Sequence, residues 1–200
     1  MLYLKLKLQG VLQSYGGPES GWVDIRNTLR QPTASAVAGI IACCMGVKPN
    51  TPEYRHLLTL DYRTTTNEKA TVLEDYQIIG PPRISNPFNK SEPYILGCDA
   101  GAKAQLPITK HYLQDGTKHY VHTETGNKGE QADKCLTFYV LVGSNDTVEL
   151  QNIHYALRHP VWVPYLGRAC CTPSAPLIGG TFDARPLESW EGEFIICPLQ

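Results

Sequence analysis

The sequence predicts an α+β fold, and three observations support this prediction. Apolar residues alternate with polar ones at 2–8 and return in a similar pattern at 135–143, which indicates strands, whereas 147–158 has near-helical spacing. Gly and Pro are abundant, at 17 and 15 of 200 residues, which favours short elements joined by turns. A chain of 200 residues is also long enough to bury one core without disulfides or metals, so we expect a single domain over 1–200.

The first part of the chain supplies one strand and one helix. In the strand predicted at 2–8, the four leucines share one face. A turn-rich loop at 13–31 leads into a helix predicted over 32–46, with Thr33 or Ser35 as its N-cap and a glycine as its stop. Its apolar face contains Val37, Ile40, Ile41, Cys44 and Met45. We expect this face to pack against the leucines of the first strand.

The middle of the chain is predicted to leave the sheet. A short helix is expected at 52–59 and further strands of the sheet at 60–66 and 71–79. Pro- and Asn-rich sequence then begins, and a second polar run ends shortly before the next alternating strand. The region of about 80–134 is therefore predicted to be an excursion, with one strand inside it at 107–116.

The last part of the chain repeats the pattern of strand, helix and strand. After the strand at 135–143, Asn145 or Asp146 is expected to cap the helix at 147–158, and a final strand is expected at 193–197. The apolar face of this helix is predicted to contain Val148, Ile153, Ala156 and Leu157. The order of elements is that of a ferredoxin-like βαββαβ core with a long insertion.

Composition limits the possible partners and the compartment. The formal net charge is −1, so the chain has no overall basic field, and any nucleic-acid site must be local. Seven cysteines, an odd number with two adjacent pairs, are atypical of a secreted disulfide framework and favour a reducing compartment. The sequence also lacks a signal-type segment and a long apolar run. We therefore expect a cytoplasmic protein without a membrane partner.

Sequence motifs give little support to cofactor or metal chemistry. The sequence has no glycine-rich dinucleotide motif, no Walker lysine motif and no Gly-x-Ser-x-Gly elbow. The adjacent cysteines lack the spacing of zinc sites. His119, His122 and Glu124 lie in a polar, glycine-rich run, where surface histidines are more common than metal ligands. We expect no cofactor and no metal.

Two Lys-His doublets leave open a catalytic hypothesis. A histidine and a lysine near a tyrosine can cleave RNA without a metal, by attack of the 2′-hydroxyl. The doublets are Lys110-His111 and Lys118-His119, and the available tyrosines are Tyr62, Tyr112 and Tyr120. The alternative is that these basic residues contact phosphate or solvent on an exposed hairpin, and we favour it.

Three separate blocks, at 159–182, 6–16 and 30–47, resemble the CasD type of Cascade subunit, found in type I-E CRISPR systems, within the repeat-associated mysterious protein superfamily. The stretch HPVWVPYLGRACCTPSAPLIGGTF at 159–182 is similar to a family signature built around P-Y-L-G-R. LKLQGVLQSYG at 6–16 and RQPTASAVAGIIACCMGV at 30–47 resemble the opening strand and first helix of that family. A weaker match joins LEDYQIIG at 73–80 to ITKHYLQDG at 108–116.

The match has departures from the family pattern. Ala34 and Ala36 replace the usual basic residue and glycine of the first helix, and Ala169 replaces a second arginine after YLGR. Each change removes a possible contact to phosphate or backbone. RNA binding is therefore expected to depend on other positions, and the run at 116–134 is a candidate.

The resemblance implies an RRM-like core whose long β-hairpin, the thumb, folds over a guide RNA. It implies a non-catalytic subunit that binds the 5′ handle of the crRNA and caps the backbone filament of Cascade in antiviral defence. The implied partners are the backbone subunit, the large subunit, the crRNA-processing endoribonuclease and, through the complex, target DNA. Two alternatives stay open: a metal-independent crRNA-processing endoribonuclease like the type I-C relative, and an α+β module that binds only protein.

The expected RNA contacts combine this resemblance with the chemistry of single-stranded RNA binding. Tyr165 and Arg168 flank a glycine that permits close backbone approach. The amides at Thr33 to Ser35 begin a helix, where phosphate can bind, and Lys110 and His111 are expected at the base of the thumb. The full set is Gln13, Ser14, Tyr15, Gly16, Arg26, Arg30, Thr33, Ser35, Lys110, His111, Tyr165, Leu166, Gly167 and Arg168.

Overall fold

The central element of the computed structural model is a five-stranded antiparallel sheet, in the order β10-β3-β8-β1-β9. The structure describes residues 1–16, 25–79, 83–85, 93–95, 106–116 and 135–198. The strands of this main sheet are β1 (Leu2–Gly10), β3 (Asp61–Thr64), β8 (Leu136–Ser144), β9 (Ala184–Arg185) and β10 (Ile195–Ile196). Together with the helices described below, this antiparallel sheet confirms the predicted mixture of helices and strands.

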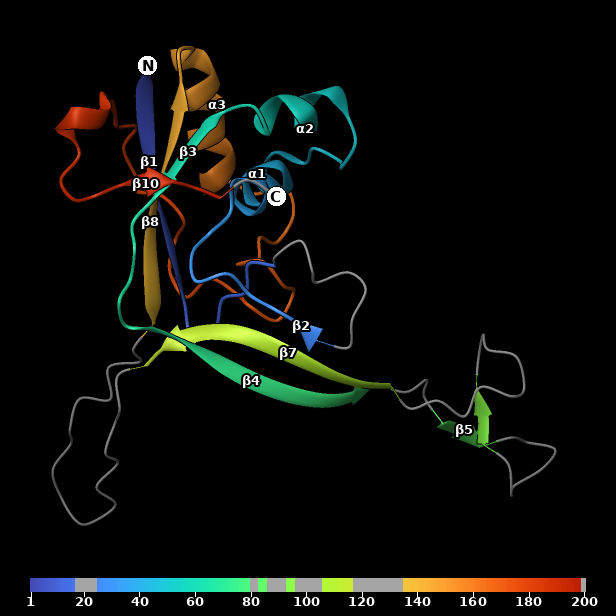
Figure 1. Ribbon diagram of the computed structural model, residues 1–200. Coiled ribbons are helices and arrows are strands. Elements are labelled where there is room, and N and C mark those ends of the chain that lie inside the picture. Colours follow the sequence, from blue (N-terminus) through green and yellow to red (C-terminus); the bar gives the residue numbers. More distant parts are fainter. Residues whose placement is uncertain (17–24, 80–82, 86–92, 96–105, 117–134, 199–200) are drawn as a thin grey trace, which may run out of the picture.

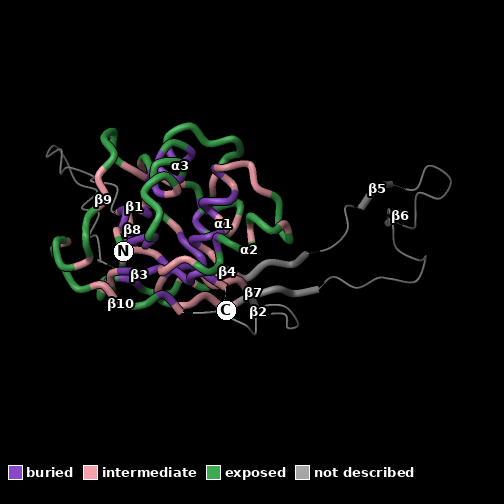
Figure 2. Tube along the Cα trace, turned by 90° about the horizontal axis from the view of Figure 1, so that it is seen from above, coloured by how far each residue is buried: buried purple, intermediate pink, exposed green. Residues whose placement is uncertain are grey.

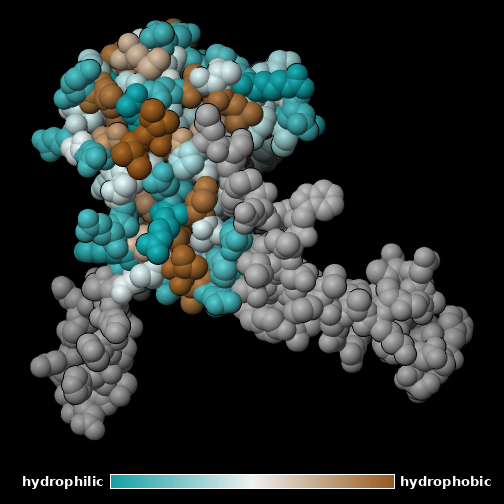
Figure 3. All heavy atoms as spheres, viewed as in Figure 1, coloured by the Kyte–Doolittle hydropathy of each residue, from teal (hydrophilic) through white to brown (hydrophobic). Residues whose placement is uncertain are grey.

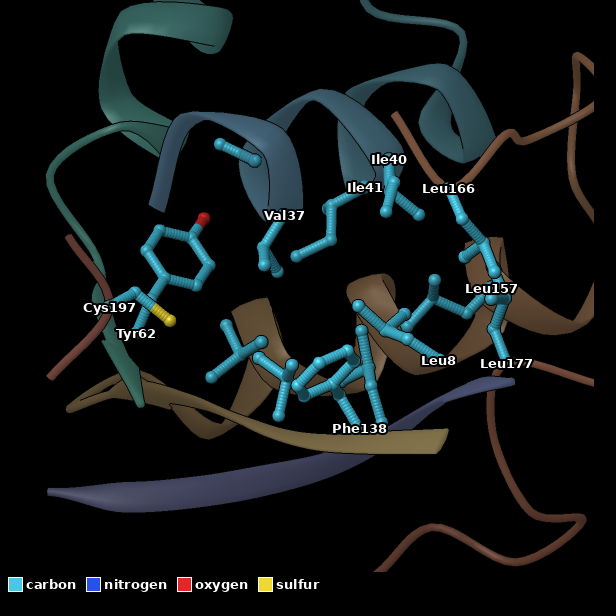
Figure 4. Packing of buried hydrophobic residues seen from close by; sticks show 14 of the residues in the cluster. Leu8, Val37, Ile40, Ile41, Tyr62, Phe138, Leu157, Leu166, Leu177 and Cys197 are labelled. Carbon is cyan, nitrogen blue, oxygen red and sulfur yellow. The ribbon is translucent and has the colours of Figure 1, made fainter. Parts of the chain in front are cut away.

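Two helices cover one face of the main sheet. They are α1 (Ala34–Met45) and α3 (Thr147–Arg158), and both lie on the same side of the sheet in Figure 1. Buried residues are concentrated between these helices and the sheet (Figure 2). Val37 and Ile41 point from α1 toward Phe138 and Leu8 (Figure 4). The predicted contact between the first helix and the leucines of the first strand is confirmed.

Alternation along the strands explains why this face is buried. Leu4, Leu6 and Leu8 lie opposite Val142, Val140 and Phe138 in the register of β1 and β8, and all six are buried. Since successive strand residues point to opposite faces, the residues between them lie on the outer face. The central sheet pair is thus apolar inside and largely polar outside.

The helix ends follow local capping chemistry. Thr33 Oγ1 accepts a hydrogen bond from Ala36 N at 3.2 Å, so Thr33 is the N-cap of α1. Gly46 closes α1 at φ 72°, a left-handed conformation that glycine adopts readily. Asp146 caps α3 by accepting from Val148 N at 2.8 Å. The short helix α2 (Pro52–Leu57) begins after Thr51, whose side chain accepts from Tyr54 N.

The predicted apolar face of α3 was partly wrong. Val148 is 61% exposed, whereas Leu150 is buried together with Ile153 and Leu157. Positions 150, 153 and 157 follow the spacing of one helical face, and position 148 lies away from it. Val148 occupies the first turn, beyond the edge of the surface that packs on the sheet.

A second sheet crosses one end of the main sheet (Figure 1). It consists of β2 (Ile25–Arg26), β4 (Ala70–Ile79) and β7 (Leu106–Asp115), and β4 pairs antiparallel with β7 along the whole length of both strands. The strand predicted at 71–79 is confirmed as β4, but it belongs to this second sheet and not to the main sheet. Both edges of β3 are already occupied, by β8 and β10, so β4 has no place beside it. The chain therefore leaves the main sheet before Ala70.

Beyond the antiparallel pair of β4 and β7, here called the ribbon, the structure describes only part of the expected excursion. The short strands β5 (Arg83–Ser85) and β6 (Pro93–Ile95) pair with each other. The remainder of the predicted excursion at 80–134 lies outside the described residues, apart from β7 and Gly116. The predicted strand at 107–116 corresponds to β7.

The C-terminal residues cross the outer face of the main sheet. β9 pairs with β1 at one edge and β10 pairs with β3 at the other, so residues 186–194, here called the C-terminal strap, pass over the face opposite the helices (Figure 1). The strap contains the 3-10 helix η2 (Leu187–Ser189). The strand predicted at 193–197 corresponds to β10, which is shorter. β9 was not predicted, because a strand of two residues is too short to show an alternating pattern.

Two searches of the described residues address membranes and metals. None of the described helices is long and apolar enough to cross a membrane. No cluster of three His, Cys, Asp or Glu residues suited to a metal ion occurs within the part of the chain that the structure describes. His119, His122 and Glu124 lie outside it.

Candidate nucleic-acid interface

A groove of about 470 Å³ lies between α1, the loop after β1 and the segment around Gly167. We call it the α1 groove. It is lined by Ser14, Tyr15, Gly16, Thr33, Ser35, Ala36, Gly39, Ile40, Cys43, Tyr54, Tyr165, Gly167 and Arg168. Residues from three of the blocks singled out in the sequence therefore meet in one depression.

The YLGR segment is fixed to the loop after β1 by backbone contacts. Ser14 N donates to Leu166 O at 3.0 Å, and Leu166 N donates to Cys171 O at 2.7 Å. Gly167 has φ 96°, and a Cβ there would lie 1.7 Å from Ser14 O. Glycine is required here because both the dihedral angle and the close approach exclude a side chain. Gly167 thereby lets the YLGR segment pack directly against the backbone of Ser14 at the groove edge.

Arg168 reaches the second sheet. Its Cζ lies 5.1 Å from the centre of the Tyr112 ring on β7, a cation–π distance. Tyr112 is buried, and its hydroxyl is 3.6 Å from the Cys170 thiol. Burial and Cys170 raise the pKa of Tyr112, whereas the Arg168 guanidinium opposes this shift. Arg168 is thus a positioned cation that also lines the groove.

Behind the groove, Gln13 and Tyr15 form a buried polar framework. Gln13 Nε2 donates to Leu136 O at 2.7 Å and to Leu8 O at 3.2 Å. The Tyr15 hydroxyl donates to Gln13 Oε1 at 2.6 Å, and burial raises the pKa of Tyr15 well above its usual value. Every polar atom of these two side chains therefore has a protein partner, which is how buried polar groups are stabilised.

Five residues predicted to contact RNA have interior side chains. They are Gln13, Ser14, Tyr15, Thr33 and Leu166, all at most 2% exposed. Ser14 Oγ donates to His111 O at 3.1 Å, so this hydroxyl ties the groove to β7. Interior side chains present little surface to a ligand, so any RNA contact of these residues would involve mainly their backbone.

The start of α1 is less open than the sequence suggested. Ala34 N, one amide of the phosphate cradle expected at Thr33 to Ser35, donates to Pro198 O at 3.0 Å, and the next amide beyond the cradle, Ala36 N, donates to Thr33 Oγ1. Ser35 is only partly buried and lines the groove. The first turn of α1 contains no acidic residue, which leaves its positive end uncompensated by a carboxylate from that turn.

The side chains of Lys110 and His111 lie on opposite faces of the second sheet. They are consecutive residues of β7, so their side chains point to opposite sides of the strand. His111 Nδ1 lies 2.8 Å from Asn27 Oδ1, and its Nε2 lies 4.0 Å from a Glu74 carboxylate oxygen. Both residues remain partly accessible beside the α1 groove without lining it.

The two predicted arginines before α1 have different outcomes. Arg26 pairs with Lys110 in the parallel contact between β2 and β7, which brings its backbone to the base of the ribbon. Its side chain lies outside the described part of the structure. Arg30 is exposed and does not line the α1 groove.

The groove also contains residues that the sequence analysis did not propose. They are Ala36, Gly39, Ile40, Cys43 and Tyr54. The first four have the spacing of residues on one face of a helix. Three of them are small, and this pattern could have indicated from the sequence that α1 contributes to a groove. Tyr54 gave no signal, because its position depends on how α2 packs against α1.

Comparisons with known proteins agree with the sequence resemblance. The model of the family described as CRISPR-associated protein (Cas_Cas5) matches residues 3–188. The CRISPR system Cascade subunit CasD of Escherichia coli (strain K12) is 23% identical over 182 residues, which cover 91% of this chain and 72% of that protein.

Two solved structures have a similar fold. A chain from a structure titled CRISPR RNA-guided surveillance complex matches with a TM-score of 0.62 and 24% identity, over 88% of this chain. This protein spans 61% of the length of that chain. A structure titled Crystal structure of Cas protein matches with a TM-score of 0.54 and 22% identity, over 93% of this chain and 67% of that one.

Proposed function

This chain belongs to the Cas5 family of CRISPR-associated proteins, since the family model covers residues 3–188, and from this premise we propose that it is an RNA-binding subunit of a Cascade complex. Its proposed ligand is the 5′ handle of the crRNA, and its proposed place is the cap of the backbone filament. The observation that supports this best is the meeting of Tyr165, Gly167 and Arg168 with the start of α1 in one groove.

The groove has the chemistry that single-stranded RNA requires. Bases stack on aromatic rings, and arginine or backbone groups bind phosphate. Tyr165 is 37% exposed, Arg168 supplies a positioned cation, and Gly167 is exposed at the groove edge, where it packs against the Ser14 backbone. Because the net charge of the chain is −1, such a local arrangement is needed to attract a polyanion.

The fold supports an RRM-like core as part of this proposal. The order β3-β8-β1-β9, with α1 and α3 on one face, supports the proposal of a ferredoxin-like βαββαβ unit. The ribbon of β4 and β7 would then be the base of a thumb. The backbone subunit, the large subunit, the processing endoribonuclease and target DNA are proposed as partners within the complex, by analogy with the family.

We further propose that the chain is not catalytic. Metal-independent cleavage needs a base and an acid on the two sides of one scissile phosphate. Lys110 and His111 point to opposite faces of β7, and Tyr112 is buried under Arg168, so this set does not converge. Incubation of the purified protein with repeat RNA in EDTA tests this point. Cleavage that His111→Ala abolishes would instead establish the endoribonuclease alternative.

RNA retention tests the binding proposal. The chain is expressed with its operon, and the crRNA in the purified complex is measured for the Tyr165→Ala, Arg168→Ala double variant. Tyr155→Ala with Arg158→Ala is a matched control, because it removes the same residue types at the same spacing from α3. We expect the complex with the groove variant to contain about tenfold less crRNA, because one stacking contact and one phosphate contact are removed. The complex with the control variant should retain its crRNA. Equal RNA in both variants would refute the proposal.

A further inference from the structure

The α1 groove has an open space over the middle of α1. Gly39 lies at the floor, and apart from its chain neighbours and the backbone of its own helix, no described heavy atom is within 4 Å of the position that its Cβ would occupy. The residues one turn before and after it, Ala36 and Cys43, are small and also line the groove. Glycine disfavours a helix interior, and packing does not explain it here. The absence of a side chain at position 39 makes the groove deeper.

The walls around this space are aromatic and neutral. Tyr54 from α2 and Tyr165 from the YLGR segment both line it, and Tyr165 is more than a third exposed. Ile40 adds an apolar surface, and among the described residues that line the groove, none is acidic. Arg168 supplies the positive charge in the lining. An apolar floor with aromatic walls suits the face of a nucleobase, whereas a phosphate alone needs several hydrogen-bond donors.

We propose that the space over Gly39 takes one unpaired nucleobase of the bound RNA, while Arg168 contacts the phosphate backbone beside it. This inference rests on the proposed function and adds a base-binding position to it. A volume of about 470 Å³ is within the range of small-molecule pockets, so this open groove has room for one nucleotide. Recognition is through stacking and shape, which every base provides.

Filling the space without disturbing the fold tests the proposal. Gly39→Leu places a branched side chain in the groove and improves helix propensity, because leucine is a better helix residue than glycine. Gly39→Ala is the matched control, because it improves the helix but adds only one methyl group. Circular dichroism and thermal unfolding of both full-length variants check that α1 is intact.

The readout separates bases from phosphates. Fluorescence anisotropy measures the affinity of each protein for a short oligoadenylate and for an abasic ribose-phosphate oligomer of the same length. Stacking of one base predicts that the wild-type protein and Gly39→Ala prefer the oligoadenylate by about tenfold. Gly39→Leu should lose this preference and keep its affinity for the abasic oligomer.

The possible results distinguish this inference from the proposed function. A preference for bases that survives in Gly39→Leu overturns the base-binding position and leaves RNA binding intact. Equal affinity of the wild-type protein for both oligomers also overturns it. Failure of the wild-type protein to bind either oligomer contradicts the proposed function and the inference together.

Discussion

Gly167 is the residue on which the shape of the groove edge depends most. Its φ of 96° and the 1.7 Å that would separate a Cβ from Ser14 O leave room for no other residue. The YLGR motif could be singled out from sequence, and so could the tyrosine and arginine on each side of the glycine. The contact with Ser14 could not, because it joins residues far apart in the chain.

Substitution of Gly167 should destabilise the protein. We expect Gly167→Ala to lower the free energy of unfolding by about 1–3 kcal/mol, since alanine disfavours this conformation and its Cβ displaces the backbone of Ser14. Gly179→Ala is the control, with no atom of the described chain within 4 Å of its Cβ and an expected change of about 0.5 kcal/mol or less. Urea unfolding measures both. Equal stability of the two variants would contradict this role of Gly167.

The burial of the polar loop after β1 could not be predicted from the sequence. Gln13, Ser14 and Tyr15 are polar residues in a loop, and such residues are usually solvated or bind ligands. In the structure they are buried, because the loop packs between β7, β8 and the YLGR segment. Burial of a polar loop depends on its neighbours in space, which a single sequence does not reveal.

At the scale of elements, α1 links the core to the groove. One side of the helix packs on the main sheet through Val37 and Ile41, and another lines the α1 groove through Ala36, Gly39 and Cys43. Its existence, its cap and its apolar face followed from local sequence, because helix signals lie within a few turns. The place of β4 depended on which strand edges were free, and local sequence carries no such information.

The N-cap of α1 gives a test at this scale. Thr33→Ala should lower the free energy of unfolding by about 1 kcal/mol, because Ala36 N loses its hydrogen-bond acceptor. Thr33→Ser keeps the hydroxyl and should retain most of the stability. Thermal and urea unfolding compare the two variants. If serine were as damaging as alanine, the cap would not be the source of the effect.

At the scale of the whole molecule, two surfaces compete as nucleic-acid sites. One is the α1 groove, and the other is the outer face of the main sheet, where Lys5, Lys7 and Tyr139 lie. The C-terminal strap crosses this outer face, and Lys5 Nζ lies 4.5 Å from the Tyr139 ring centre and 5.5 Å from that of Trp190. Hydrophobic and hydrophilic patches are mixed on the face shown in Figure 3.

The strap was beyond sequence prediction for a physical reason. The two strands on either side of it, β9 and β10, are each two residues long and lie at opposite edges of a sheet whose strand order is set by the rest of the chain. The strap covers part of the outer face with Trp190, so the α1 groove is the more open of the two surfaces to RNA.

Removal of the strap tryptophan tests how firmly the strap is held. Trp190→Ala should lower the free energy of unfolding by about 1–2 kcal/mol, since the ring lies near both Lys5 and Arg185. Trp162→Ala is the control, because this tryptophan is 43% exposed and should contribute about 0.5 kcal/mol or less. Similar unfolding curves for the two variants would show that the strap is not packed as described.

The proposed function requires RNA to lie in the α1 groove. Ultraviolet cross-linking of the complex purified with its crRNA, followed by mass spectrometry of the cross-linked peptides, tests it most directly. We predict cross-links at Tyr165 or on the groove side of α1, where the aromatic ring and the open helix face meet. Cross-links at Tyr139 on the outer sheet face, with none in the groove, would contradict RNA binding in the α1 groove.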